Sequence, residues 1–170
     1  VLMLVALTEF EQTKLKEQLE ARTVSRRYWA IISGHWTKRK TIDTVIHRNR
    51  GDGLRGTREN AADKGQRAIT HVQPLSKLQG ASMVQCVLET GRTHQIRIHL
   101  SEAKHPVLGD TLYGSMRMAN RAPRLALHAF SLSFQHPRTG EPKMFRVPLA
   151  DDLEKLRRTL AHGYGSRAQS

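Results

Sequence analysis

Residues 88–100 read Leu-Glu-Thr-Gly-Arg-Thr-His-Gln-Ile-Arg-Ile-His-Leu, and residues 109–114 add Gly-Asp-Thr-Leu-Tyr-Gly shortly afterwards. An apolar strand is expected to end at Glu89, and Gly91 then provides a turn into an amphipathic helix. That helix carries two arginines and two histidines. Cationic side chains therefore gather where a strand passes into a helix and leaves backbone N–H groups free, an arrangement that suits phosphate.

The rest of the chain alternates short apolar runs with amphipathic stretches. Apolar runs predict strands, and apolar residues spaced three or four apart predict helices. Strands outnumber helices and hairpins link several of them, so we expect an α+β fold with a largely antiparallel mixed sheet flanked by helices. The expected strands cover residues 2–7, 26–33, 43–46, 68–75, 83–89, 125–134 and 143–148, and the expected helices cover residues 8–21, 93–103 and a segment from 151 onward.

Local signals indicate where these elements begin and end. Thr8 and Glu11 form a capping box at the start of the first helix, and Asp151 can cap the last helix. Residues 136–140, His-Pro-Arg-Thr-Gly, predict the turn between the last two strands. The apolar residues that the first and last helices are expected to bury are Phe10, Leu15, Leu19, Leu153, Leu156 and Leu160.

The length of 170 residues suits a single core. We expect one domain over residues 1–162 and a flexible tail over residues 163–170. The apolar run 2–7 is too short to span a membrane and lacks the flanks of a signal peptide, so a cytoplasmic protein is expected. The single cysteine, Cys86, rules out an internal disulfide, and its apolar neighbours predict that it is buried.

A strong positive charge marks the composition. The chain has 28 Lys and Arg against 15 Asp and Glu, which gives a net charge of +13. Such a surface attracts polyanions, although any one of these cations by itself is better explained as a solvated surface group. Residues 34–67 are expected to form a mobile basic insertion that could clamp RNA. The basic residues fall into two groups, one of Lys38, Arg39, Lys40, Arg48, Arg50, Arg55, Arg58, Lys64 and Arg67, and one of Arg117, Arg121 and Arg124.

Residues 88–114 resemble the signature of the RluA-type RNA pseudouridine synthases, because both quoted blocks occur in the same order at short spacing. Residues 1–8 resemble the strand that follows the active-site loop of that family, residues 25–34 its tyrosine-bearing strand, and residues 136–148 its late hairpin. The resemblance implies the family's fold and the conversion of uridine to pseudouridine in structured RNA, either rRNA or tRNA. It implies no cofactor and no metal, and we expect no membrane partner and a monomer.

One part of the family pattern is missing. The nucleophilic aspartate of this family lies in a His-Arg-Leu-Asp-type loop just before the strand that residues 1–8 resemble, and the sequence contains no such loop. The chain begins with Val1 and opens directly on an apolar run. We therefore expect a fragment that lacks the N-terminal part of the catalytic domain and is inactive by itself.

The resemblance assigns catalytic roles to two residues. Arg97 matches the basic residue that pairs with the catalytic aspartate, and a guanidinium can hold a carboxylate through two parallel hydrogen bonds. Tyr28 matches the tyrosine whose ring packs on the target uracil and whose hydroxyl can help remove the C5 proton. Without the resemblance, Arg97 reads as an exposed helix arginine and Tyr28 as half-buried core. Both are expected to line one cleft, whereas Trp29 should point to the opposite face and join the core.

Neighbouring residues are expected to contact the RNA. Arg92 stands at the strand-to-helix turn, where it can meet phosphate. His94 and His99 are five residues apart on a helix and do not share a face, which argues against a metal site. Asp110 lies in a glycine-rich turn that resembles a structural position of the family. The residues expected to bind RNA are Arg92, Thr93, His94 and Arg27.

Three hypotheses remain open at this point. The first is the C-terminal part of an RluA-type pseudouridine synthase, active once the aspartate loop is restored. The second is a catalytically inactive RNA-binding relative of the same fold. The third is a basic structural or ribosome-associated protein, and it predicts that Tyr28 and Arg97 lie far apart.

Overall fold

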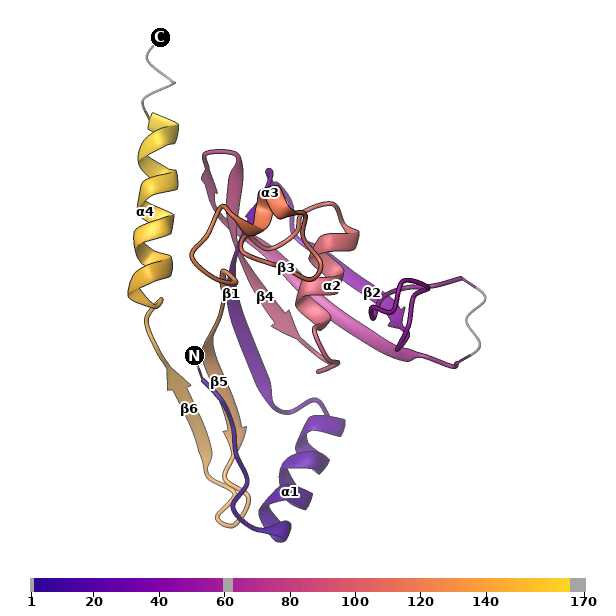
Figure 1. The fold of residues 1–170 in the computed structure, drawn as a ribbon. Helices are drawn as coiled ribbons and strands as arrows, with labels where there is room; N and C mark the ends of the chain where they lie inside the picture. The colour runs from indigo at the N-terminus through magenta and orange to yellow at the C-terminus, as the bar shows by residue number, and fades with distance from the viewer. Residues whose placement is uncertain (1, 60–62, 166–170) are drawn as a thin grey trace.

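The computed structural model describes residues 2–59 and 63–165 and contains one six-stranded antiparallel sheet with helices packed around it (Figure 1). Neighbouring strands follow the order β2-β3-β4-β1-β5-β6. The α+β class and the antiparallel sheet are therefore confirmed. The strands are β1 (Ser25–Ser33), β2 (Lys40–Ile46), β3 (Gln66–Leu78), β4 (Ala81–Leu88), β5 (Leu127–Gln135) and β6 (Pro142–Arg146).

Strand alternation decides which side chains share a face of this sheet. Arg26 on β1 is in register with Leu88 on β4, and Leu88 is in register with Thr70 on β3. Directly opposed residues point to the same face, and so does Tyr28, two residues after Arg26. Trp29 points to the other face, where its ring stacks on Phe130 with the centroids 4.0 Å apart. The alternation predicted for β1 is thus confirmed.

Helix α1 (Glu9–Glu20) begins where the capping box predicts, with the Glu11 amide donating to Thr8 Oγ1 at 3.3 Å. Its apolar contacts are fewer than expected, since Leu15 is buried but Phe10 remains 49% exposed. The Phe10 ring lies instead under the guanidinium of Arg138, 5.3 Å from the centroid. A cation–π contact with the turn between β5 and β6 therefore replaces core burial at this position.

Helix α4 (Asp151–Gly165) differs from its prediction at both ends. The Ala150 carbonyl accepts from the amides of Leu153 and Glu154, so Asp151 is the first helical residue rather than the cap. Residues 163–165, assigned above to a flexible tail, belong to the helix, and the remainder of that tail lies outside the described residues. Leu153 is buried as predicted, whereas Leu156 and Leu160 are half-buried.

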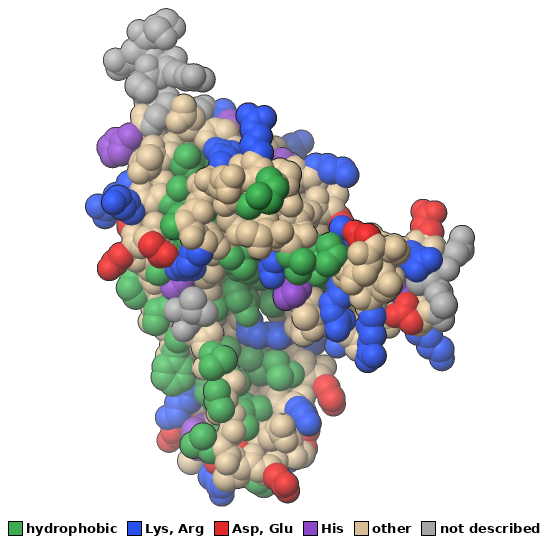
Figure 2. Space-filling model, in the orientation of Figure 1, with side chains coloured by type: hydrophobic (Ala, Val, Ile, Leu, Met, Phe, Trp, Pro, Cys, Tyr) green, Lys and Arg blue, Asp and Glu red, His purple; other side chains and the backbone are tan. Residues whose placement is uncertain are grey.

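The N-terminal run 2–7 is not the buried strand that its composition predicts. Only the Leu2 amide bonds to the neighbouring β5, at the Ala129 carbonyl at 3.0 Å, and no ladder follows within the described residues. Met3 is 82% exposed and Leu7 is 88% exposed. The run lies alongside β5 (Figure 1), and apolar side chains are exposed along it (Figure 2). An apolar run is fully buried only where a second layer covers its outer side, and the described residues provide none there.

Residues 34–67 contain more regular structure than a mobile insertion would. Seven of them form β2, which pairs with β3 from Lys40 to Ile46. Residues 47–59 and 63–65 form a basic arm beyond the ends of β2 and β3, and Figure 2 shows Lys and Arg side chains at its outer end. Two of the arginines in this region already hold carboxylates: Arg50 of the arm pairs with Asp52, and Arg67 at the start of β3 pairs with Asp43. Their charge is therefore partly neutralised within the chain.

Two short helices complete the fold. Helix α2 (Gln95–Glu102) begins two residues later than predicted, and the four-residue α3 (Met116–Ala119) was not predicted. Cys86 is fully buried, and burial raises the pKa of its thiol to about 12, in accord with a purely structural role. Among residues 2–59 and 63–165, no helix has the length and apolar character that a bilayer crossing requires.

Candidate active site

Helix α2 is fixed to the sheet by buried hydrogen bonds rather than by apolar contacts alone. Gln95 Nε2 donates to Thr70 Oγ1 and to the Ile69 carbonyl, each at 3.0 Å. His99 Nδ1 lies 2.8 Å from Thr70 Oγ1, and its Nε2 lies 2.9 Å from Thr44 Oγ1. Because Thr70 shares a face with Arg26 and Tyr28, α2 stands on the face that carries the candidate tyrosine.

His99 is buried and held as a neutral ring. Burial lowers its pKa from 6.5 to about 4. The Thr70 hydroxyl accepts from Gln95 and can give its own proton to His99 Nδ1, so the proton on Nε2 can go to Thr44. A hydrogen-bonding role for His99 is thus observed, and it lies in fixing α2 to β2 and β3.

Acid is expected to weaken the fold through His99. The folded pKa of about 4 lies below the unfolded value of 6.5, so the unfolded state binds more protons between them. The contribution of the neutral His99 to the free energy of unfolding is complete above about pH 6.5. It decreases as the pH falls to about 4, by ~3 kcal/mol in total. Urea unfolding of the wild type and of His99→Gln at about pH 7, 5 and 4 measures this, because other titrations are common to both proteins. Parallel stability curves for the two proteins would refute it.

The turn before α2 is organised by the same Gln95 side chain. Its Oε1 accepts from Thr90 Oγ1 at 2.8 Å and from the Arg92 amide at 3.0 Å. His94 takes a left-handed conformation, with φ 58°, and its Nδ1 lies 3.1 Å from the Tyr113 hydroxyl. Burial and the neighbouring Arg97 lower the pKa of His94. Among the predicted RNA-binding residues, Thr93 and His94 are exposed, and Arg92 is half-buried with Nε on the Arg67 carbonyl at 3.1 Å.

Arg97 is held by a carboxylate of the chain itself. Its Nε and Nη2 donate to the two Asp110 oxygens at 2.8 and 2.7 Å, and its guanidinium lies 5.1 Å from the Tyr113 ring centroid. Asp110 also accepts from the amides of Leu112 and Tyr113, both at 2.9 Å. Burial alone would raise the pKa of Asp110, but these hydrogen bonds outweigh it and hold the pKa below its usual range. Asp110 therefore has a structural role, as expected, because it orients Arg97. The Arg97 side chain is 16% exposed.

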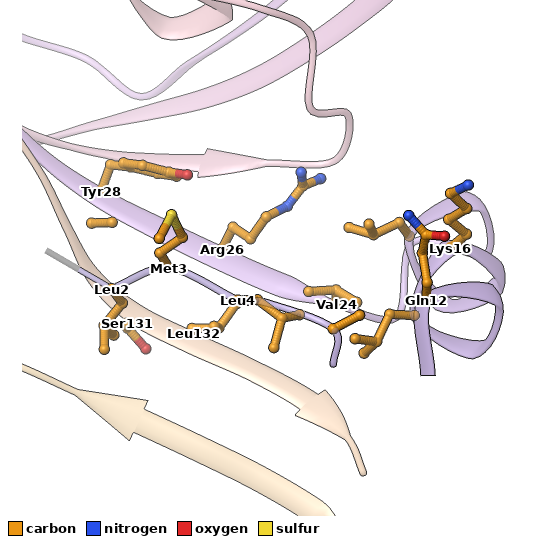
Figure 3. A pocket seen from close by; sticks show the side chains of 14 residues that line it. Leu2, Met3, Leu4, Gln12, Lys16, Val24, Arg26, Tyr28, Ser131 and Leu132 are labelled. Atoms are coloured by element: carbon orange, nitrogen blue, oxygen red, sulfur yellow. The ribbon is translucent and has the colours of Figure 1, made fainter. Parts of the chain in front are cut away.

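Tyr28 borders an open pocket of about 410 Å³ between β1, β5, α1 and the N-terminal run (Figure 3). Its side chain and that of Arg26 project from β1 into the same space (Figure 3). Burial raises the pKa of Tyr28, so its phenol stays neutral near pH 7. No Asp or Glu stands among the described residues that line the pocket, which are Leu2, Met3, Leu4, Ala6, Gln12, Leu15, Lys16, Leu19, Val24, Arg26, Tyr28, Ala129, Ser131 and Leu132.

The predicted site residues are brought together only in part. Tyr28 and helix α2 share one face of the sheet, but Arg97 does not line the Tyr28 pocket. Arg27 is exposed and alternates to the opposite face. Arg26, which the sequence analysis passed over, is the basic residue beside Tyr28. The signal that could have found it is the two-residue spacing from Tyr28 along a strand.

A second pocket adjoins the first at Arg26. It has a volume of about 380 Å³ and lies between the end of α1 and the turn before α2. Glu89 in this pocket is paired with Arg22 at 2.7 Å and with His71 at 2.6 Å. The lining residues are Leu19, Glu20, Arg22, Arg26, Glu89, Thr90, Gly91 and Arg92.

The site combines a basic strand-to-helix turn with a pocket that holds a neutral tyrosine, on one face of an antiparallel sheet. A sequence model of the RNA pseudouridylate synthase family matches residues 2–102, which is more than half of the chain. The chain belongs to this family.

Curated relatives and solved structures agree with that assignment. Ribosomal large subunit pseudouridine synthase D of Neisseria meningitidis is 40% identical over 91% of this chain and 44% of its own length. The protein of the same name from Nitrosomonas europaea is 38% identical over 98% of this chain and 50% of its own. Human RNA Pseudouridylate Synthase Domain Containing 1 superposes with a TM-score of 0.72 at 28% identity, covering 92% of this chain and 73% of that one. The chain spans about half the length of the curated relatives it matches.

Proposed function

We propose that this chain forms part of an enzyme that converts uridine to pseudouridine in the RNA of the large ribosomal subunit, acting as a monomer in the cytoplasm without a metal or a cofactor. The observation that carries the proposal is the Tyr28 pocket on the α2 face of the sheet, in a chain of this family. The names of its relatives supply the choice of ribosomal RNA over transfer RNA.

The chemistry requires a base held outside its helix. Isomerisation breaks the C1′–N1 bond, joins C1′ to C5 and moves the C5 proton to N1, so no atom is gained or lost and no oxidant is needed. A uridine cannot do this while paired, and flipping it out costs roughly a few kcal/mol of stacking. The Tyr28 ring offers a surface for the uracil, and its hydroxyl can assist removal of the C5 proton by accepting it while releasing its own proton to solvent at the open pocket.

The nucleophilic carboxylate is proposed to come from a part of the protein outside these 170 residues. The pocket around Tyr28 has no described carboxylate, and Asp110 is already held by Arg97 and two amides. Arg97, oriented by Asp110, is proposed to pair with that nucleophile through its remaining exposed edge. Arg92, Thr93 and His94 are proposed to meet RNA at the turn before α2, and Arg27 from the opposite face of the sheet.

The direct test is to incubate the complete gene product with unmodified large-subunit ribosomal RNA and to map pseudouridine by carbodiimide labelling and primer extension. New stops at defined uridines support the proposal. Tight RNA binding without any pseudouridine would instead support an RNA-binding relative, the candidate favoured by the lack of a described carboxylate in the pocket.

RNA affinity is expected to fall steeply with salt, because cations that contact phosphates release counterions. Two phosphate contacts alone give a slope of about −1.8 in log K against log salt, or about tenfold between roughly 50 and 200 mM. Fluorescence anisotropy with a labelled rRNA stem-loop across that range measures the slope. An affinity that stays constant across this salt range would show that the cationic surface does not contribute to RNA binding.

A further inference from the structure

Arg26 is a half-buried guanidinium without a carboxylate. Its Nε is fully buried and has no hydrogen-bond partner among the described residues. Burial lowers its pKa, the Tyr28 phenol opposes this effect, and the nearby Arg92 adds to it. Arginines in such surroundings normally carry an anionic partner, because an unpaired buried charge is costly. A half-buried guanidinium without a carboxylate partner can therefore bind an anionic group of a ligand.

The neighbouring backbone is shaped to let Arg26 lie where it does. A Cβ built at Gly91 would meet the Arg26 guanidinium. Gly91 therefore lets the guanidinium pass close to the turn before α2. The φ of Gly91 is not positive, so backbone conformation does not demand glycine at this position. Space for the arginine is the physical reason for glycine here.

Arg26 lines both pockets of the site, which differ in chemistry. The pocket on the Tyr28 side is mostly apolar, whereas the pocket on the Arg92 side is lined by charged groups. The carboxylate of Glu89 in the second pocket is already held by Arg22 and His71. Glu20 is its other carboxylate, and Arg26 and Arg92 make no ion pair with any described residue. The mostly apolar Tyr28 pocket can thus hold a base, and the adjoining charged pocket can hold a phosphate. Arg26 lies at the junction of these two pockets.

We propose that Arg26 binds a backbone phosphate next to the target uridine while the base occupies the Tyr28 pocket. The inference rests on the proposed function and adds a specific phosphate-binding residue to it. The phosphate would meet Arg26 and Arg92 together, which fixes how far the nucleotide enters. Arg27, one residue along and on the opposite face, has no part in this contact.

The experiment uses the complete gene product and an rRNA stem-loop that contains the target uridine. Arg26→Ala is compared with Arg146→Ala, which removes the same charge from an exposed residue of β6 on the opposite face of the sheet. Affinity is measured by anisotropy and turnover by single-turnover kinetics, on native RNA and on RNA with a neutral methylphosphonate at each linkage flanking the target. Arg26→Ala should weaken binding of native RNA by about 10- to 100-fold, since a hydrogen bond to a charged group has that magnitude. Arg146→Ala should change the affinity less than about threefold.

The decisive result is the coupling between the residue and the phosphate. One flanking methylphosphonate should weaken wild-type binding as Arg26→Ala does, and should weaken the Arg26→Ala protein no further. Gly91→Ala, which keeps every charge but displaces the guanidinium, should reproduce most of the loss. Additive effects at every flanking linkage would overturn the proposal and leave Arg26 as a partner for a protein carboxylate. If the wild type makes no pseudouridine, the proposed function fails, but the affinity cycle still decides the role of Arg26.

Discussion

Replacing Arg97 by Ala should lower the free energy of unfolding by ~3–5 kcal/mol, because it leaves the Asp110 carboxylate buried without its cation. The Asp110 side chain is 0% exposed, and Arg97 provides two of its hydrogen bonds. Turnover by the complete gene product should also collapse, since the guanidinium proposed to face the nucleophile is gone. Much of the RNA affinity should remain, because the other cations proposed to contact phosphates are unchanged. Urea unfolding, single-turnover kinetics and anisotropy measure the three quantities.

A double-mutant cycle separates the structural cost from the catalytic one. Asp110→Asn alone should destabilise the fold, and Arg97→Ala combined with Asp110→Asn should cost less than the sum of these two single changes. Arg97→Lys keeps the charge but loses the bidentate geometry, so it should recover part of the stability and little of the turnover. A stable Arg97→Ala protein with normal turnover would show that this ion pair matters to neither property.

Tyr28→Phe should lower the single-turnover rate by about 100-fold or more while leaving the fold intact, because a positioned general acid or base contributes about 10²–10⁴. The Tyr28 hydroxyl makes no hydrogen bond with a described residue, so stability should change by less than ~0.5 kcal/mol. Tyr28→Ala should add a loss of affinity, since the surface for the uracil disappears. Kinetics and affinity on one rRNA stem-loop, with urea unfolding beside them, check all of these.

The comparison of the two Tyr28 variants is informative in itself. A rate loss confined to Tyr28→Ala would assign the ring alone to the reaction, with the hydroxyl unused. A Tyr28→Phe protein with a rate within about twofold of wild type would therefore contradict proton transfer through the phenol, and an unchanged Tyr28→Ala protein would remove the pocket from the mechanism.

Much of the fold follows from the sequence, and the failures have physical causes. The Thr8 capping box and the β1 alternation were predicted because their determinants lie within a few residues. The N-terminal run 2–7 was predicted as a buried strand because its composition is apolar, but burial depends on what covers it. The prediction that Phe10 is buried was wrong for a similar reason, since its contact, Arg138, lies far away in the sequence.

The sequence by itself determined the family, the antiparallel α+β class, the cationic turn before α2 and the tyrosine on β1, because each is encoded in spacing that local geometry translates directly. Only the tertiary structure decided what each charge meets. In the folded chain Arg97 pairs with Asp110, His99 is buried between two threonines, and Arg26 has no ion-pair partner among the described residues at the junction of two pockets. The physical reason is that charge pairing and desolvation depend on distances between segments far apart in the chain, and a linear pattern does not contain those distances.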